Sequence, residues 1–317
     1  MTTLISRAQG CLLGQLAGDS LGSLVEFQTP EAIRRDYPEG VRELADGGIW
    51  NTLAGQPTDD SEMALLLARC LAENGRYDPV KAREAYEWWL ASDPFDAGMT
   101  VSAALRGQPN PESQSNGAMM RVSPLGIFGA RHGLAQTAEW AQQDAVITHI
   151  HPICLQANAL YAMAIAHAIG TCAGPREIYD RVREWAAEME AEPELRKTID
   201  NAADGPPPDF LDRQGWVLIA FRNALWRLLA APDLETGVVD TVMCGGDTDT
   251  TAAICGALLG AVYGREAIPS QWEHAVLNCR PSANDPHVKR PRPQRLWPTD
   301  ALELAKTLAT VSANPTD

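Results

Sequence analysis

The segment GCLLGQLAGDSLG, residues 10–22, places a glycine at every fourth position of an apolar, helix-periodic stretch covering residues 5–25. Positions four apart share one face of a helix, and a glycine in a helix costs about 1 kcal/mol relative to alanine. Four glycines on one face therefore indicate that a neighbouring helix lies very close. The predicted helix 247–264 carries a similar stripe of Ala252, Gly256, Gly260 and Gly264. We expect these two helices to lie in the centre of the protein, near each other.

The rest of the chain is also helical in pattern, and it contains neither β-alternation nor a hairpin dipeptide between β-rich runs. Aromatic residues make up only 6% of the chain, which favours closely packed helices over a β-sandwich. We predict an all-α fold in one domain, residues 1–317. Capping-box patterns are present at Asp59-x-x-Glu62 and Asp300-x-x-Glu303. Further helices are expected over 59–74, 78–92, from Ser123-Pro124 onward, over 134–147, 152–169 and 215–230, and over 300–310, with an amphipathic, charged segment at 175–200 and loops at 107–117 and 204–210.

The formal charge of −15 argues against nucleic acid as a general partner, because an acidic surface repels phosphate backbones. The one basic stretch, residues 287–295, is short and broken by prolines, and it is interpreted as a solvated loop. The N-terminal apolar run is too short for a membrane span and lacks signal-peptide features. Seven cysteines without metal-ligand spacing indicate reduced, buried side chains in a cytoplasmic protein.

Two short clusters pair carboxylates with hydroxyls where a loop becomes a helix: Thr58-Asp59-Asp60 and Asp247-Thr248-Asp249-Thr250. Hard divalent cations such as Mg²⁺ and Mn²⁺ prefer such oxygen ligands. The four aspartates carry a charge of −4, which two divalent ions would neutralise, and a pair of ions can activate water. The alternative is helix capping, for which Asp and Thr are favoured without any metal.

Five segments together resemble the ADP-ribosylglycohydrolase family. They are GCLLGQLAGDSLG at 10–22, PTDDSEMAL at 57–65, SNGAMMR at 115–121, THIHP at 148–152 and GGDTDT at 245–250. They occur in the family's order and cover about 240 residues. The resemblance implies an all-helical fold with a centre of two divalent ions, Mg²⁺ or Mn²⁺. It implies as metal ligands Thr58, Asp59, Asp60, Asp247, Asp249 and Thr250.

The resemblance also suggests two catalytic carboxylates. Glu26 matches an acidic residue near the metals of serine-type relatives, and its alternative is a solvated glutamate at a helix end. Asp96 lies in DAGMTV, similar to a motif of the arginine-type bacterial enzyme in which the aspartate faces the guanidinium side of the bond that is cut. Its alternative is an ordinary loop or capping aspartate. The choice of base between these two residues stays open.

Three further residues match the family's substrate loop. Ser115, Asn116 and Gly117 correspond to the loop that cradles the diphosphate and ribose of ADP-ribose, although the same residues suit an ordinary turn. His149 and His151 flank a helix start where the family has a histidine near the ribose, with His149 preferred. Either histidine could instead be structural.

The implied activity is hydrolysis of the N-glycosidic bond between ADP-ribose and a modified protein side chain, with arginine favoured. The partners would be an ADP-ribosylated protein as substrate and ADP-ribose as product, with no membrane. Other acceptors, namely serine, a nucleic-acid base or a small molecule, remain alternatives. So does a non-catalytic structural member, as in the jellyfish lens crystallins that resemble the family. An unrelated helical metallophosphohydrolase would use His-Asp pairs, and no such dipeptide is present.

Overall fold

A computed structural model describes residues 3–208 and 210–311. These residues form helices and no β-strand, with two isolated β-bridges, so the all-α prediction is confirmed. The long helices are α1 (Leu4–Gly22), α3 (Asp59–Asn74), α4 (Pro79–Ala91), α7 (Leu134–Ala145), α8 (Pro152–Thr171), α9 (Pro175–Glu188), α11 (Val217–Ala230), α13 (Thr248–Tyr263) and α15 (Ala301–Thr310). The short ones are α2 (Pro30–Asp36), α5 (Met99–Leu105), α6 (Ser123–Gly129), α10 (Pro193–Asn201), α12 (Leu234–Val242) and α14 (Ser270–Asn278), with 3₁₀ turns at Met119–Arg121, Arg265–Ala267 and Gln294–Leu296.

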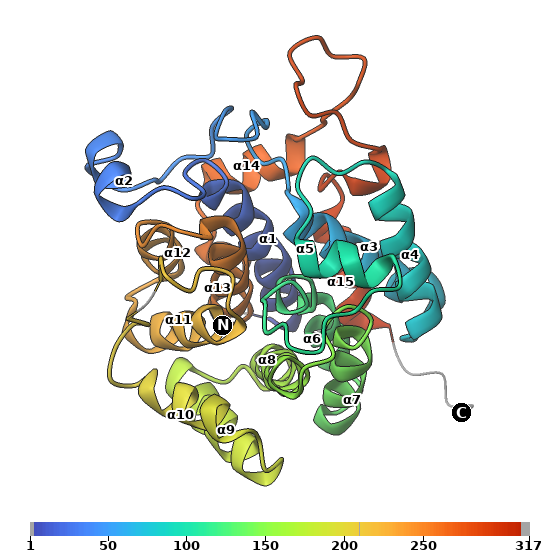
Figure 1. The fold of residues 1–317 in the computed structure, drawn as a ribbon, viewed down its shortest axis with the longest axis vertical. Helices are drawn as coiled ribbons and strands as arrows, with labels where there is room; N and C mark the ends of the chain where they lie inside the picture. Colours follow the sequence, from blue (N-terminus) through green and yellow to red (C-terminus); the bar gives the residue numbers. More distant parts are fainter. Residues whose placement is uncertain (1–2, 209, 312–317) are drawn as a thin grey trace.

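The predicted pair of small-faced helices, α1 and α13, forms the centre of the molecule (Figure 1). A β-carbon added at Gly14 would overlap the backbone carbonyl of Gly256, and one added at Gly10 would lie 2.5 Å from the carbonyl oxygen of Gly260. Side chains are excluded from this contact, so the two backbones touch. The glycine stripes thus allow α1 and α13 to pack at a backbone-to-backbone distance that any larger side chain would prevent.

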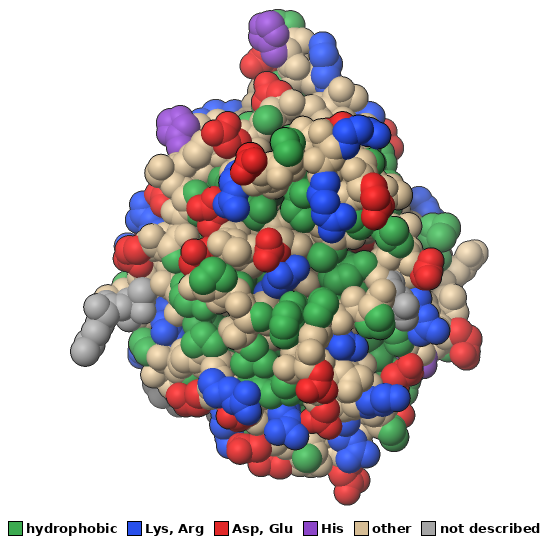
Figure 2. Space-filling model, turned by 90° about the vertical axis from the view of Figure 1, so that its left-hand side faces the viewer, with side chains coloured by type: hydrophobic (Ala, Val, Ile, Leu, Met, Phe, Trp, Pro, Cys, Tyr) green, Lys and Arg blue, Asp and Glu red, His purple; other side chains and the backbone are tan. Residues whose placement is uncertain are grey.

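The other helices surround this pair. Helices α8, α11 and α12 pack on α13, α15 packs on α1 and α3, and α6 and α7 pack on α8. Helix α8 is long and apolar enough to span a membrane by length and composition, but 78% of its apolar window is buried inside the protein, as in a core helix. Figure 2 shows the face at the left of Figure 1, where basic side chains alternate with acidic ones.

Most predicted helices are present with ends shifted by a few residues, but several details were wrong. The segment 175–200, predicted only as amphipathic and charged, forms two helices, because Glu190 adopts a left-handed conformation (φ 49°) and Pro193 starts a new helix. Helices α2, α5, α12 and α14 were missed; each has only seven to nine residues. The loop predicted at 107–117 is present. The loop predicted at 204–210 is non-helical where it is described, and Asp209 lies outside the described residues.

Both predicted capping boxes are incorrect. Helix α3 is preceded by Thr58, and Glu62 does not return to the cap but binds Arg292 with both carboxylate oxygens, at 2.7 and 2.8 Å. Asp300 binds Arg69 instead of capping α15. The carboxylates in both places are instead paired with arginines that lie 230 and 231 positions away in the chain.

Two predictions of side-chain exposure, for the basic stretch 287–295 and for the cysteines, also change. Arg292, in the stretch interpreted as solvated, is 6% exposed. Five of the seven cysteines are buried as predicted, whereas Cys172 is exposed at the end of α8 and Cys244 is half-buried.

Candidate active site

The packing of α1 against α13 places the end of the 10–22 motif beside the 245–250 motif. The helices are antiparallel, with Gly10, Gly14, Gly18 and Gly22 opposite Gly260, Gly256, Ala252 and Thr248 in turn. At the last step the Thr248 hydroxyl donates to the Gly22 carbonyl at 2.7 Å. The end of α1 therefore lies against the start of α13. Thr248, which was left out of the predicted ligands, is occupied by this structural bond.

The loop that follows α1 is fixed to the loop that precedes α13. The amide of Phe27 donates to the carbonyl of Gly246 at 2.8 Å, and the amide of Gly246 donates to the carbonyl of Gln28 at 3.0 Å. Gly246 has φ +75°, which only glycine adopts without cost. Phe27 itself has φ +61°, a conformation rare for an aromatic residue. This reciprocal pair of bonds sets the position of the neighbouring Glu26.

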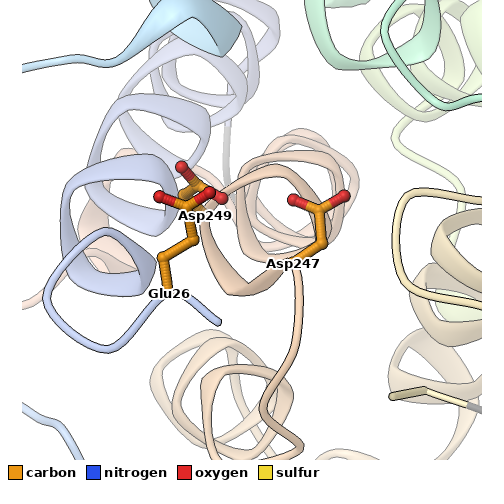
Figure 3. A group of neighbouring side chains, drawn as sticks. All are labelled: Glu26, Asp247 and Asp249. Atoms are coloured by element: carbon orange, nitrogen blue, oxygen red, sulfur yellow. The ribbon is translucent and has the colours of Figure 1, made fainter. Parts of the chain in front are cut away.

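Glu26, Asp247 and Asp249 form a cluster in which one carboxylate oxygen from each lies within 4.8 Å of the others. Figure 3 shows the carboxylates of Glu26 and Asp249 side by side. Asp249 lies in the first turn of α13, and Asp247 lies just before this helix. Asp247 occupies the cap position of α13, but its side chain makes no capping bond. Its Oδ2 accepts a 2.7 Å hydrogen bond from Nδ2 of Asn116 instead. Capping therefore does not explain Asp247.

The Thr58-Asp59-Asp60 motif contacts an aspartate that the sequence analysis missed, Asp19 of α1. The Thr58 hydroxyl lies 2.9 Å from Asp19 Oδ1 and 2.9 Å from Asp60 Oδ2. A hydroxyl has one hydrogen, so it can donate to only one of these two oxygens. Asp60 Oδ1 is buried and has no hydrogen-bond partner. An acidic residue inside a small-residue helix, as Asp19 is, was the signal available in the sequence.

A cavity of about 320 Å³ joins the two motifs. Glu26, Asp59, Asp96, Asp247 and Asp249 all line it, and so does Thr250. Thr58 and Asp60 are fully buried behind this wall. The predicted convergence of the two clusters is therefore observed, and the two candidate bases face the same cavity.

The electrostatics of this cavity are those of crowded, buried acids. Burial, and then the neighbouring Asp96, raise the pKa of Glu26 to about 8. Burial followed by Asp247 raises the pKa of Asp96 to about 6, and burial raises that of Asp19 to about 7. The pKa values of Asp59, Asp60 and Asp249 are also raised well above normal, by burial first and by other carboxylates second. Within residues 3–208 and 210–311, no lysine, arginine or histidine forms a salt bridge with these carboxylates.

The predicted substrate loop lies along the same cavity, which Ser115, Asn116 and Gly117 line. The amide of Asn116 donates to the carbonyl of Gly215 at 2.9 Å. The two histidines are not among the residues that line the cavity. His151 caps α8, since its Nδ1 accepts from the amide of Ile153 at 3.2 Å. His149 is fully buried behind Ser115, with Nε2 2.7 Å from the serine Oγ.

Residues outside the recognised motifs support the two candidate bases. Trp50 Nε1 donates to Glu26 Oε2 at 2.7 Å. The Trp50 ring lies 5.8 Å from that of Phe95, which precedes Asp96. Arg290 donates to the Trp50 carbonyl and places its guanidinium over the Phe95 ring. Nothing in the local sequence pattern of these residues indicated this contact.

Comparison with known proteins decides the family. The family model described as ADP-ribosylglycohydrolase matches residues 1–313. The chain belongs to the ADP-ribosylglycohydrolase family. A solved structure described as an ADP-ribosylglycohydrolase-related protein complex aligns with a TM-score of 0.79 at 28% identity, covering 98% of this chain and 99% of that one. The predicted family and its all-α fold are both confirmed.

Several relatives of this ADP-ribosylglycohydrolase have names that state an activity. It is 32% identical over 281 residues to the ADP-ribosyl-[dinitrogen reductase] glycohydrolase of Rhodospirillum rubrum, covering 84% of this chain and 88% of the relative. It is 26% identical to the ADP-ribosylarginine hydrolase Tri1 of Pseudomonas putida, covering 86% and 74%. It is 24% identical to the ADP-ribosylhydrolase ARH3 of Xenopus tropicalis, covering 86% and 91%. The protein is thus a hydrolase of the ADP-ribosylglycohydrolase type.

Proposed function

We propose that this protein is a metal-dependent hydrolase that removes ADP-ribose from arginine side chains of modified proteins. The observation that carries the proposal is the single cavity lined by Asp96, Glu26 and both aspartate motifs. Its acidity complements a guanidinium leaving group and the oxocarbenium-like state of glycosidic cleavage. Relatives named ADP-ribosylarginine hydrolase support arginine as the acceptor.

The residues present fit divalent cations. Asp60 Oδ1 is buried without a partner, and the Thr58 hydroxyl lies between two carboxylate oxygens although it can donate to only one. Buried carboxylates without counter-charge are costly unless they are paired or bind a metal. We propose that two ions, Mg²⁺ or Mn²⁺, are held by Thr58, Asp59, Asp60, Asp247, Asp249 and Thr250. When bound, such ions lower the pKa of a coordinated water and neutralise the site.

Glu26 lies close enough to two of these proposed ligands to be a further ligand. Its carboxylate forms a cluster with Asp247 and Asp249 that is small enough for one cation. The sequence analysis considered Glu26 only as a base. We propose that it either completes the metal site or acts on the water beside it.

The remaining steps belong to side chains of this chain. Ser115, Asn116 and Gly117 would hold the diphosphate and ribose along one wall of the cavity. Asp96 or Glu26 would take a proton from the attacking water, and the products are free ADP-ribose and unmodified arginine. Without bound metal, the pKa values of Asp96 and Glu26 are raised to about 6 and about 8; bound cations would lower both and leave a carboxylate ionised to accept the proton. We further propose a cytoplasmic location.

The test is incubation with arginine-ADP-ribosylated and serine-ADP-ribosylated peptides, with Mg²⁺ or Mn²⁺, followed by measurement of released ADP-ribose. Release from the arginine peptide alone supports the proposal, and release from the serine peptide alone would replace arginine by serine. Asp249→Ala should abolish release, while Asp212→Ala, at an exposed position, should not. No release from any conjugate would leave a structural, non-catalytic protein.

A further inference from the structure

His149 reaches the cavity only through Ser115. Its ring is fully buried and is not part of the cavity wall, whereas Ser115 is. Nε2 lies 2.7 Å from Ser115 Oγ, and Nδ1 lies 2.8 Å from the hydroxyl of Thr148. Each ring nitrogen thus has one hydroxyl partner, and the position of the ring hydrogen decides which partner donates.

The position of the ring hydrogen is determined by the hydrogen bonds at Nδ1, on the side of the ring away from the cavity. Arg121 is fully buried, is paired with Asp144 at 3.0 Å, and places Nη1 2.8 Å from Thr148 Oγ1. A guanidinium can only donate, so Thr148 Oγ1 accepts this bond. The hydrogen of the Thr148 hydroxyl then points to His149 Nδ1. The opposite tautomer would leave a buried hydroxyl hydrogen unbonded, which is unfavourable away from water.

The ring also stays neutral. Burial, with a smaller effect of the nearby positive Arg121, lowers the pKa of His149 to about 3. A neutral imidazole carries one hydrogen, and Nδ1 is already an acceptor. That hydrogen therefore lies on Nε2 and is donated to Ser115 Oγ.

Ser115 Oγ receives a second hydrogen as well. The hydroxyl of Ser113 donates to it at 3.4 Å. With both acceptor positions of Ser115 Oγ used, its own hydrogen is available to the cavity that Ser115 lines. Hydrogen bonds thus run in one direction, from Arg121 through Thr148 and His149 to Ser115.

The same buried arginine holds the substrate loop in place. Arg121 Nη1 donates to the carbonyl of Gly117 at 3.0 Å. A β-carbon added at Gly117 would lie 3.2 Å from His149 Cε1, so the loop packs directly on the ring. Loop position and hydrogen-bond direction therefore depend on one buried network.

We propose that His149 is a positioning residue that fixes Ser115 as a hydrogen-bond donor to an anionic oxygen of the ligand, a phosphate oxygen of ADP-ribose. This inference rests on the proposed function, because the ligand is the ADP-ribose of that activity. The other tautomer would accept the Ser115 hydrogen and turn the serine lone pairs toward the phosphate. The proposed role differs from the one expected from the sequence, in which His149 lies near the ribose. Here His149 acts on the ligand through its hydrogen bond to Ser115.

The first test is direct observation of the tautomer by ¹⁵N NMR of histidine-labelled protein at neutral pH. The chain has six histidines, and His149→Gln identifies the signal by its loss. The expected state is a neutral ring with hydrogen on Nε2. In Thr148→Val, where the hydroxyl is gone, this preference should weaken. Hydrogen on Nδ1 in the unmodified protein overturns the proposal.

The second test measures binding of ADP-ribose by calorimetry. His149→Leu should weaken binding about tenfold or more, because a hydrogen bond to a charged group is worth about 1.5–3 kcal/mol. His149→Gln, whose amide nitrogen can stand in for Nε2, should restore most of the affinity. His274→Leu, on the exposed face of α14, is the matched control and should bind normally. In turnover, KM should rise while kcat stays within about twofold.

The outcomes separate this inference from the proposed function. If no conjugate is hydrolysed but ADP-ribose binds, weakens in His149→Leu and recovers in His149→Gln, the positioning role stands and the hydrolytic function fails. If hydrolysis occurs and His149→Leu binds ADP-ribose like the unmodified protein, the positioning role fails alone. If ADP-ribose does not bind at all, both fail.

Discussion

Asn116 donates a 2.7 Å hydrogen bond from Nδ2 to Oδ2 of Asp247, and so joins the predicted substrate loop to the predicted metal motif. The two residues lie 131 positions apart in the chain. The bond orients the Asp247 carboxylate toward Glu26 and Asp249 and occupies one of its oxygens. A residue that orients a metal ligand in this way influences metal affinity without touching the metal.

The first prediction concerns this bond. Asn116→Ala should weaken Mn²⁺ binding about 10–100-fold, the range found for residues that orient ligands. Titration calorimetry of the metal-free protein measures it. Asn110→Ala is the matched control, since Asn110 lies in the same loop and its exposed side chain accepts a bond from the backbone of Glu112, away from the carboxylates. Equal affinity in the two variants would mean that Asp247 is not a ligand or does not need orienting.

The second prediction is the pH dependence of stability without metal. The pKa of Glu26 is about 8 and that of Asp96 about 6 in the folded protein, both above their unfolded values near 4. The folded state therefore holds protons that the unfolded state releases. The stability from these groups is fully present below about pH 4 and is lost as pH rises to about 8.

Asp249→Asn isolates this effect, because it removes one buried, uncompensated carboxylate. The metal-free variant should be about 1–3 kcal/mol more stable than the unmodified protein at pH 8 and nearly equal to it at pH 5, by urea denaturation. The comparison cancels the opposite contribution of His149, whose pKa is lowered to about 3 and which reduces stability as pH falls below about 6.5. With saturating Mn²⁺ the order should reverse. A variant less stable than the unmodified protein at pH 8 without metal would show that the carboxylates do not repel one another.

The sequence was sufficient for the part of the site that follows from backbone contact. A glycine every fourth residue is a local pattern, and it predicted that α1 and α13 lie near each other. In the structure their contact brings Glu26, which the family resemblance suggested, beside Asp247. Residues whose partners lie far along the chain were not predictable in this way. Arg292 binds Glu62 across 230 positions, and neither residue carries a local mark of the other. The histidines could not be separated because their roles depend on burial behind Ser115, which no motif encodes.

The third prediction tests the glycine contact itself. Gly14→Ala should destabilise the protein by about 3 kcal/mol or more, or prevent folding, because the new methyl group overlaps the backbone of Gly256 on an adjacent helix and neither backbone can move freely. Gly205→Ala is the control, since a β-carbon there meets nothing within 4 Å. Thermal denaturation compares the two. A Gly14→Ala protein that melts with the control would contradict the close α1–α13 contact.

The fourth prediction concerns the buried ion pair that supports the Asp96 loop. Arg292 is bound to both oxygens of Glu62 and to the carbonyls of Ser92 and Asp93, shortly before Asp96. Arg292→Met leaves the Glu62 carboxylate buried and unpaired, so it should cost about 3–5 kcal/mol in urea denaturation. It should also reduce turnover at temperatures where the variant is still folded, because the loop that carries Asp96 loses its anchor.

The control is Arg295→Met, which removes an exposed arginine whose pair with Glu73 spans 3.4 Å, and it should cost less than about 1 kcal/mol. A second change, Glu62→Gln in the Arg292→Met protein, should recover part of the stability without recovering turnover, since it removes the unpaired charge and keeps an acceptor for Trp89 Nε1 but does not restore the anchor. Recovery of both would mean that Arg292 contributes only to stability.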